Sequence, residues 1–152
     1  MSLRKKIQLD QNEIREFLHK QRNIQIGTIN KDGSPHLTTM WYSMDHSNIL
    51  FHTYTKSQKI KNIYRDSRVS ILTESGDSYD NLKGILIYGK ATVIEGGNDK
   101  ERVLDIMKEI EKKYETGSGN NDYIEFLRMQ VLKRSAVLVE PDKYISWDHT
   151  KI

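Results

Sequence analysis

Residues Ile24–Tyr54 read IQIGTINKDGSPHLTTMWYSMDHSNILFHTY, and this stretch predicts three antiparallel strands connected by tight turns. Its first strand alternates apolar with polar or small residues, the spacing of a strand with one buried face. The KDGS sequence that follows is a strong hairpin signal, because Gly33 readily adopts the positive φ that such turns need. The strands are expected over Ile24–Asn30, His36–Met44 and Ile49–Tyr54, with a polar turn over Asp45–Asn48.

The rest of the chain alternates between amphipathic helices and short strands. Asp10 and Glu13 have the spacing of a capping box, which predicts the start of a helix that ends near Gln21. Further helices are expected over Lys56–Arg65, Asp99–Glu115 and Asp122–Leu132, with a break over Thr116–Asn121. Further strands are expected over Val69–Thr73, Leu82–Glu95, Ala136–Glu140 and, after an interruption at Pro141, Lys143–Trp147.

These elements predict a mainly β fold with peripheral helices in one domain that spans residues 1–152. The early strands lack the helical crossovers of a parallel sheet. We therefore expect a closed or nearly closed antiparallel barrel of about six or seven strands. In the helix over Lys56–Arg65, the side chains of Ile60, Ile63 and Tyr64 are expected to face the core.

The composition excludes several classes of site. The chain has no cysteine, which rules out disulfides, thiolate zinc sites and cysteine nucleophiles. The five histidines show no metal-ligand spacing, so no metal site is predicted. No apolar run approaches the roughly 20 residues of a membrane helix, and no signal peptide is visible. We expect a cytoplasmic protein that does not bind membranes.

The segment Thr53–Asn62, TYTKSQKIKN, has the features of an anion site. A strand is predicted to end near Tyr54 and a helix to begin near Ser57, which leaves the first N–H groups of the helix without partners. Several donors would surround this helix start: the hydroxyls of Thr53, Thr55 and Ser57, the ammonium groups of Lys56 and Lys59, and the amide of Asn62. The alternative is a plain Ser or Thr cap followed by a solvated basic face. The segment has no glycine, so it is not a nucleoside triphosphate loop.

Four blocks of the sequence resemble one family. The blocks NIQIGTINKDGSPHLTTMWY, ILFHTYTKSQKIKNIYRDSRVSIL, LIYGKATVI and VEPDKYISWD are similar, in this order, to the pyridoxamine 5'-phosphate oxidase-like split β-barrel proteins. The closest similarity is to the branch described as probable coenzyme F420-dependent (deazaflavin) reductases. The resemblance implies a six-stranded antiparallel split barrel that forms homodimers, with two cofactor sites at the dimer interface.

The resemblance also implies site residues. It places the cofactor phosphate on Thr53–Asn62, with contacts from Thr53, Lys56, Ser57, Lys59 and Asn62. FMN-binding relatives often read Ser-Arg-Lys where this chain has Ser57-Gln58-Lys59. It assigns the ring system to the strand that carries Thr38, Thr39, Met40 and Trp41. Trp147, near the C-terminus, is expected either to cover the cofactor or the dimer seam or to anchor the core.

The function implied is that of an oxidoreductase that transfers a hydride between coenzyme F420 or FMN and a small organic substrate. No catalytic residue is assigned, since the cofactor performs the difficult step, although Tyr42 or bound water could supply a proton. The basic side chains of Lys61, Arg65 and Arg68 would suit the acidic tail of coenzyme F420. The alternative is a non-catalytic flavin- or haem-binding carrier, sensor or stress protein. Nucleic-acid binding is not expected, because the aromatic residues are not interleaved with Lys and Arg.

Overall fold

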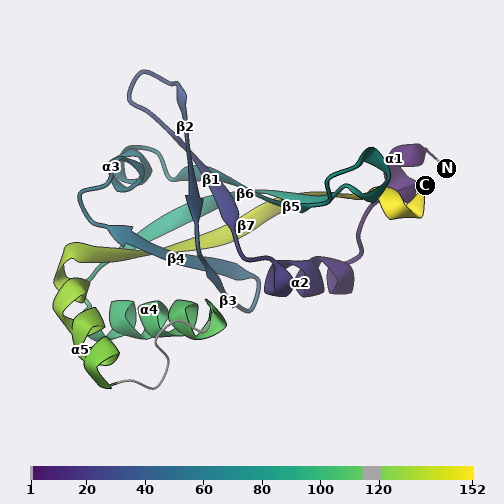
Figure 1. The fold of residues 1–152 in the computed structure, drawn as a ribbon. Coiled ribbons are helices and arrows are strands. Elements are labelled where there is room, and N and C mark those ends of the chain that lie inside the picture. Colours follow the sequence, from purple (N-terminus) through teal and green to yellow (C-terminus); the bar gives the residue numbers. More distant parts are fainter. Residues whose placement is uncertain (1, 115–120) are drawn as a thin grey trace.

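The computed structural model describes residues 2–114 and 121–152, which form one antiparallel sheet with helices around it (Figure 1). The predicted break over Thr116–Asn121 lies almost wholly outside the described residues. The strands are β1 (Ile24–Ile29), β2 (Pro35–Met40), β3 (Ser43–Asp45), β4 (Asn48–Tyr54), β5 (Arg68–Ser75), β6 (Lys83–Glu95) and β7 (Arg134–Asp148). The α-helices are α1 (Leu3–Lys6), α2 (Gln11–Lys20), α3 (Gln58–Arg65), α4 (Lys100–Tyr114) and α5 (Asn121–Gln130), with 3-10 turns over Tyr79–Asn81, Val131–Lys133 and His149–Lys151.

The sheet has seven strands in the order β2-β1-β5-β6-β7-β4-β3, so β2 and β3 are its two edges. Within the described residues these edges do not pair with each other, and the barrel is not closed. The strand predicted over His36–Met44 is therefore wrong as a single element. Seven strands lie within the count expected from the predicted elements and are one more than the resemblance implied. The chain leaves the ladder at Tyr42, whose backbone N–H donates to the Tyr114 hydroxyl (3.2 Å) instead of to a neighbouring strand.

The prediction that Pro141 interrupts the last strand is also wrong. β7 runs through it, and the irregularity falls at the register shift between Tyr88 and Gly89 of β6. A proline has no N–H to give to the ladder. Gly89 lies opposite Pro141, and an added Cβ there would meet the Glu140 carbonyl oxygen at 2.5 Å. The bulge and the missing side chain together let the two long strands stay paired.

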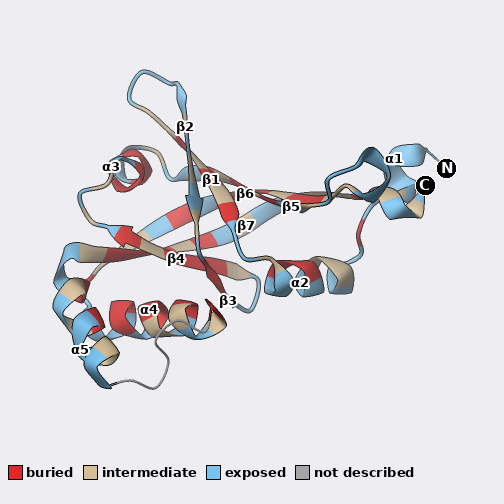
Figure 2. Ribbon diagram, in the orientation of Figure 1, coloured by how far each residue is buried: buried red, intermediate tan, exposed pale blue. Residues whose placement is uncertain are grey.

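Two hydrophobic clusters share strand β4. Phe51 belongs to the cluster inside the barrel, and the next residue toward the N-terminus, Leu50, belongs to the cluster between the sheet and α4. Figure 2 shows the corresponding buried faces on β4 and α4. β4 is thus covered on both faces, which buries Thr53 and half-buries His52. Contrary to the prediction, Tyr64 does not join the core. It is 60% exposed, since the buried face of α3 is centred on Ile60 and Ile63.

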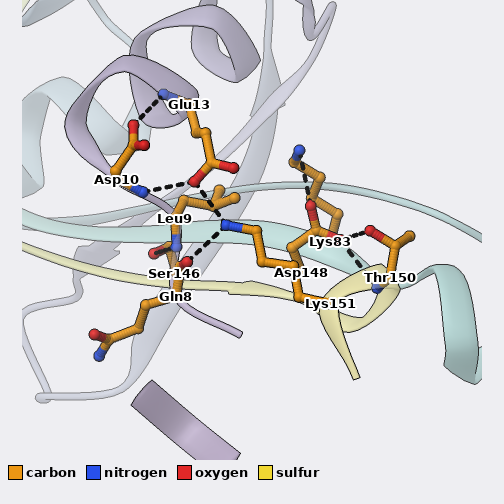
Figure 3. A network of polar contacts seen from close by, with 9 residues as sticks. All are labelled: Gln8, Leu9, Asp10, Glu13, Lys83, Ser146, Asp148, Thr150 and Lys151. Carbon is orange, nitrogen blue, oxygen red and sulfur yellow. Dashed lines mark hydrogen bonds and ion pairs between the residues drawn. The ribbon is translucent and has the colours of Figure 1, made fainter. Parts of the chain in front are cut away.

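The two ends of the chain are held together by polar contacts (Figure 3). Lys151 donates to the carboxylate of Glu13 (2.7 Å) and to the carbonyl of Gln8 (2.9 Å). The buried carboxylate of Asp148 pairs with Lys83 at 3.0 Å. The predicted capping box at the start of α2 is confirmed, since Asp10 and Glu13 exchange both bonds. None of the helices in the described part of the chain is long and apolar enough to span a membrane.

Candidate functional site

A buried ammonium group lies where β4 gives way to α3. Lys59 is in the first turn of α3 and is only 9% exposed. Its Nζ donates to the hydroxyl of Thr53 (3.4 Å), and that hydroxyl is 3.5 Å from the Ser57 hydroxyl. No carboxylate in the described residues forms an ion pair with Lys59. We call Thr53, Ser57 and Lys59 the cradle.

The direction of the Lys59 side chain follows from the helix. The buried residues of α3 are Lys59, Ile60, Asn62 and Ile63, which have the spacing of one helical face. Lys59 must share this face with two isoleucines, so its ammonium is partly withdrawn from water. Burial lowers the pKa of Lys59. A buried cation without an anionic partner is costly, and an anion that entered the cradle would remove that cost.

The start of α3 is also unpartnered. Ser57 occupies the cap position in extended conformation, yet its side chain makes no capping hydrogen bond. Its own N–H donates to the Tyr54 carbonyl (2.9 Å). The N–H groups of the first turn therefore lack the acceptor that a Ser cap usually provides. The plain cap with a solvated basic face, which the sequence left open, is not what the structure has at Ser57 and Lys59.

Asn62 holds α3 against β1. It is completely buried, and its Nδ2 donates to Thr28 Oγ1 (3.0 Å) and Asn30 Oδ1 (2.9 Å). Its Oδ1 accepts from Gln58 (2.8 Å) and Arg65 (3.1 Å). The amide thus has no hydrogen-bonding position left for a phosphate, and its place in the structure is that of a support for the cradle.

The other basic residues are only partly available. Lys56 is exposed beside the cradle, in the turn before α3. Arg65 donates to the Ile29 carbonyl as well as to Asn62, and Arg68 is paired with Asp66 at 2.7 Å. Two of the three cations that were expected to suit an acidic tail are therefore engaged inside the chain.

The residues predicted for the ring system lie on the edge strand β2. Thr38 and Met40 are half-buried and Thr39 is exposed. The Thr38 hydroxyl is buried and has no hydrogen-bond partner in the described part of the chain. Since β2 pairs only with β1, the backbone groups along its other edge are unpaired. Trp41 follows the strand and is 42% exposed.

Trp147 is not brought to the cradle within one chain. Thr53 pairs with Ser135 near the start of β7, whereas Trp147 pairs with Gly84 near its end. At about 3.3 Å per residue, the two positions are separated by roughly 40 Å along β7. Figure 1 shows this strand running from the α5 side of the molecule to the side where both termini lie.

The family model described as pyridoxamine 5'-phosphate oxidase matches residues 11–146. The chain belongs to the pyridoxamine 5'-phosphate oxidase family. No curated protein matches the sequence significantly.

Solved structures place this family member among split-barrel proteins. A conserved hypothetical protein from Mycobacterium tuberculosis is 34% identical with a TM-score of 0.88, and the match covers 99% of this chain and 92% of that one. An F420 reductase is 17% identical with a TM-score of 0.66, covering 86% and 94%. The haem storage protein HutZ from Vibrio cholerae is 15% identical with a TM-score of 0.69, covering 90% and 94%. The last two similarities concern the fold alone.

The sequence did not reveal the contribution of α4 to this family member's candidate site. Tyr114, the last residue of α4, is buried under the Trp41 ring. The neighbouring Lys113 places its Nζ 3.5 Å from the centre of the Tyr42 ring. Tyr114 continues the apolar stripe of α4 four residues after Ile110, which indicated a buried position. Nothing in that spacing indicated which strand it would meet.

Tyr42 and the histidines can be assigned from their surroundings. Tyr42 is completely buried, its hydroxyl donates to the Leu18 carbonyl, and burial raises its pKa. It is poorly suited to donate a proton. His52 lies on β4, where burial and the nearby charge of Arg134 lower its pKa to about 4. Among residues 2–114 and 121–152, no group of three or more His, Asp or Glu side chains could hold a metal.

Proposed function

We propose that this family member binds the phosphate of a flavin-type cofactor in the cradle and is an oxidoreductase that transfers a hydride between coenzyme F420 or FMN and a small organic substrate. The observation that carries this proposal is the buried ammonium of Lys59, which has no carboxylate partner in the described residues. Folded proteins rarely bury a cationic side chain without an anionic partner. A phosphate group would supply the missing charge.

The chain's own residues would bind and orient the cofactor. Thr53, Ser57 and Lys59 offer donors to the phosphate, with Lys56 at the entrance. The free edge of β2 at Thr38 and Thr39 offers backbone groups to the polar edge of the ring, and Met40 and Trp41 offer apolar surface to its face. When bound, the cofactor would supply the hydride chemistry, and the protein would supply position and exclusion of water.

A homodimer belongs to this proposal. Trp147 lies too far from the cradle of its own chain, so it would reach a cofactor only from a second copy. The proposed dimer would therefore complete each site with Trp147 from the other subunit.

The test is a titration of the purified protein with coenzyme F420 and with FMN, followed by cofactor fluorescence. We expect micromolar binding of one of them and a loss of about tenfold to a hundredfold in Lys59→Ala, the range for a hydrogen bond to a charged group. If neither cofactor binds, the proposal fails. If one binds but its reduced form converts no quinone or enone substrate, the non-catalytic alternative, a flavin- or haem-binding carrier or sensor, replaces the enzyme.

A further inference from the structure

A hollow separate from the cradle lies between α2, the turn that joins β3 to β4, and β7. Its volume is about 670 Å³, within the roughly 300–1,000 Å³ of sites for small molecules. The hollow adjoins the start of β4 at Asn48, whereas Thr53 of the cradle lies near the end of β4, roughly 17 Å farther along the strand. We call this hollow the α2 groove. No residue of the cradle lines it.

One face of α2 forms the longest wall of the groove. The residues of α2 that line it follow the spacing i, i+3, i+4, i+7, i+8, which is a single stripe of a helix: Gln11, Ile14, Arg15, Leu18 and His19. Ile14 and Leu18 pack on the barrel core, so they form an apolar floor. Arg15 and His19 are exposed above it. The acidic residues of α2, Glu13 and Glu16, fall outside the stripe.

The opposite wall repeats this arrangement. Met44 is half-buried and extends the apolar floor, while His46 and Ser47 lie at the exposed tip of the turn. His46 adopts a positive φ of 55°, a conformation for which histidine is more suited than most residues. Tyr144 of β7 closes the groove, and burial raises the pKa of its phenol. The phenol therefore keeps its proton at neutral pH and can donate it in a hydrogen bond.

The rim of the groove is basic, and its lining contains no carboxylate among the described residues. Arg15 and His19 form no ion pair in the described residues. Two acids that adjoin the groove residues in the sequence, Glu13 and Asp45, already have partners. Glu13 is bound by Lys151 at 2.7 Å, and Asp45 is 3.8 Å from His46 with both side chains exposed. A basic rim over an apolar floor is complementary to a molecule with one negative charge and a compact apolar body.

We propose that the α2 groove binds a small aromatic or branched apolar molecule that carries one carboxylate or sulfonate. The acid group would lie at Arg15 and His19, and the apolar body would lie on Ile14, Leu18 and Met44. Binding there would not involve the cradle.

The test uses two fluorescent probes of the same shape, 8-anilinonaphthalene-1-sulfonate and the uncharged N-phenyl-1-naphthylamine, with the full-length chain. Amide shifts in NMR spectra locate each probe, and fluorescence gives its affinity. We expect the sulfonate to shift amides of α2 and the β3–β4 turn and to bind several-fold more tightly than the neutral probe. Arg15→Gln should weaken sulfonate binding about fivefold, the effect of an exposed ion pair, and leave the neutral probe unchanged.

Lys20→Gln is the matched control. It removes the same charge from the same helix but lies outside the stripe, and it should leave both affinities unchanged. Equal affinities of the two probes, equal effects of Arg15→Gln and Lys20→Gln, or shifts confined to other elements would each overturn the proposal. Absent binding, with α2 amides protected in a dimer, would overturn it in favour of an interface between two copies. Lys59→Ala should not alter probe binding, so a failure of the cofactor titration leaves this result independent.

Discussion

The indole ring of Trp41 lies flat on the phenol ring of Tyr114, with ring centres 4.2 Å apart and planes only 4° from parallel. Tyr114 is buried, and its hydroxyl is fixed by the Tyr42 backbone N–H and the Arg22 carbonyl. Only one face of Trp41 is therefore open to solvent, and that face is held in a defined plane. The last turn of α4 thus determines the orientation of an aromatic residue on the edge of the sheet.

Tyr114→Leu should release the Trp41 ring. The variant loses the stack and the hydroxyl, and it leaves the Tyr42 N–H without a partner. We expect a destabilisation of about 2–4 kcal/mol and a reduced indole signal in the near-UV circular dichroism. Tyr114→Phe keeps the stack and removes only the hydroxyl, so it should retain the indole signal and lose about 1–2 kcal/mol. An unchanged indole signal in Tyr114→Leu would show that Tyr114 does not orient Trp41.

Lys59→Met should stabilise the protein without cofactor while it weakens binding. Methionine has a similar length and no charge, so it removes a buried ammonium that pairs with no carboxylate in the part of the chain that the structure describes. We expect a gain of about 0.5–2 kcal/mol in the free energy of unfolding and a loss of cofactor affinity of at least about tenfold. Urea unfolding and the cofactor titration check the two halves. A variant that is destabilised and still binds cofactor would assign Lys59 a purely structural role.

The stability cost of Lys113 should depend on pH. Its ammonium lies over the Tyr42 ring, and burial, with a smaller effect of Arg22, lowers its pKa to about 8 from the usual 10.5. Below pH 8 both folded and unfolded chains carry the charge, so the full cost is present. Above pH 8 the folded chain loses the proton first, and the cost shrinks until about pH 10.5. The gap in urea midpoint between Lys113→Met and the wild type should therefore narrow from pH 7 to pH 10. A constant gap would contradict the assignment.

Asn62→Ala should be among the most damaging substitutions outside the apolar core. It removes an amide that binds Thr28, Asn30, Gln58 and Arg65. We expect a loss of about 2–4 kcal/mol, because several buried groups lose their partner at once. Lys61→Ala, an exposed neighbour on the same helix, should change stability by less than about 0.5 kcal/mol. Similar effects of both variants in urea unfolding would contradict the role given to Asn62.

Gly84→Ala should displace the Trp147 ring. An added Cβ at Gly84 would lie 2.3 Å from Trp147 Cζ2, whereas at Gly97 it would meet nothing within 4 Å. We expect Gly84→Ala to cost about 1–3 kcal/mol and to change the tryptophan emission spectrum. Gly97→Ala is the control and should leave the spectrum as it is. An unchanged spectrum in Gly84→Ala would show that Trp147 is not held against this strand.

The local features of the fold could be predicted from the sequence. The capping box at Asp10 and the hairpin at Gly33 depend on residues a few positions apart, and both are present as expected. The break at Tyr42 could not be predicted, because it depends on a hydroxyl that Tyr114 brings from 72 residues away. Tyr64 was misplaced for a related reason. Its position on α3 suited burial, but its hydroxyl bonds to Glu95, which keeps it at the surface.

The candidate site was predictable in its location and less so in its chemistry. The strand-to-helix junction at Ser57 and the cation at Lys59 could be identified from their spacing. Whether Lys59 points inward depends on which face of α3 packs against the barrel. Likewise, the four hydrogen-bond partners of the Asn62 amide come together only when α3 packs on the sheet. The separation of Trp147 from Thr53 follows from the continuity of β7. The sequence did not indicate this continuity, because Pro141 predicted an interruption.

The contacts of Lys151 with Gln8 and Glu13, together with those of Asp148, have a consequence for how the chain opens. Residues Ile7–Glu13 and Asp148–Lys151 are hydrogen-bond partners of each other, so opening either segment breaks contacts of both. Fraying, which in most domains begins at a terminus, would here lose the contacts of both ends at once as soon as it reached Ile7 or Lys151.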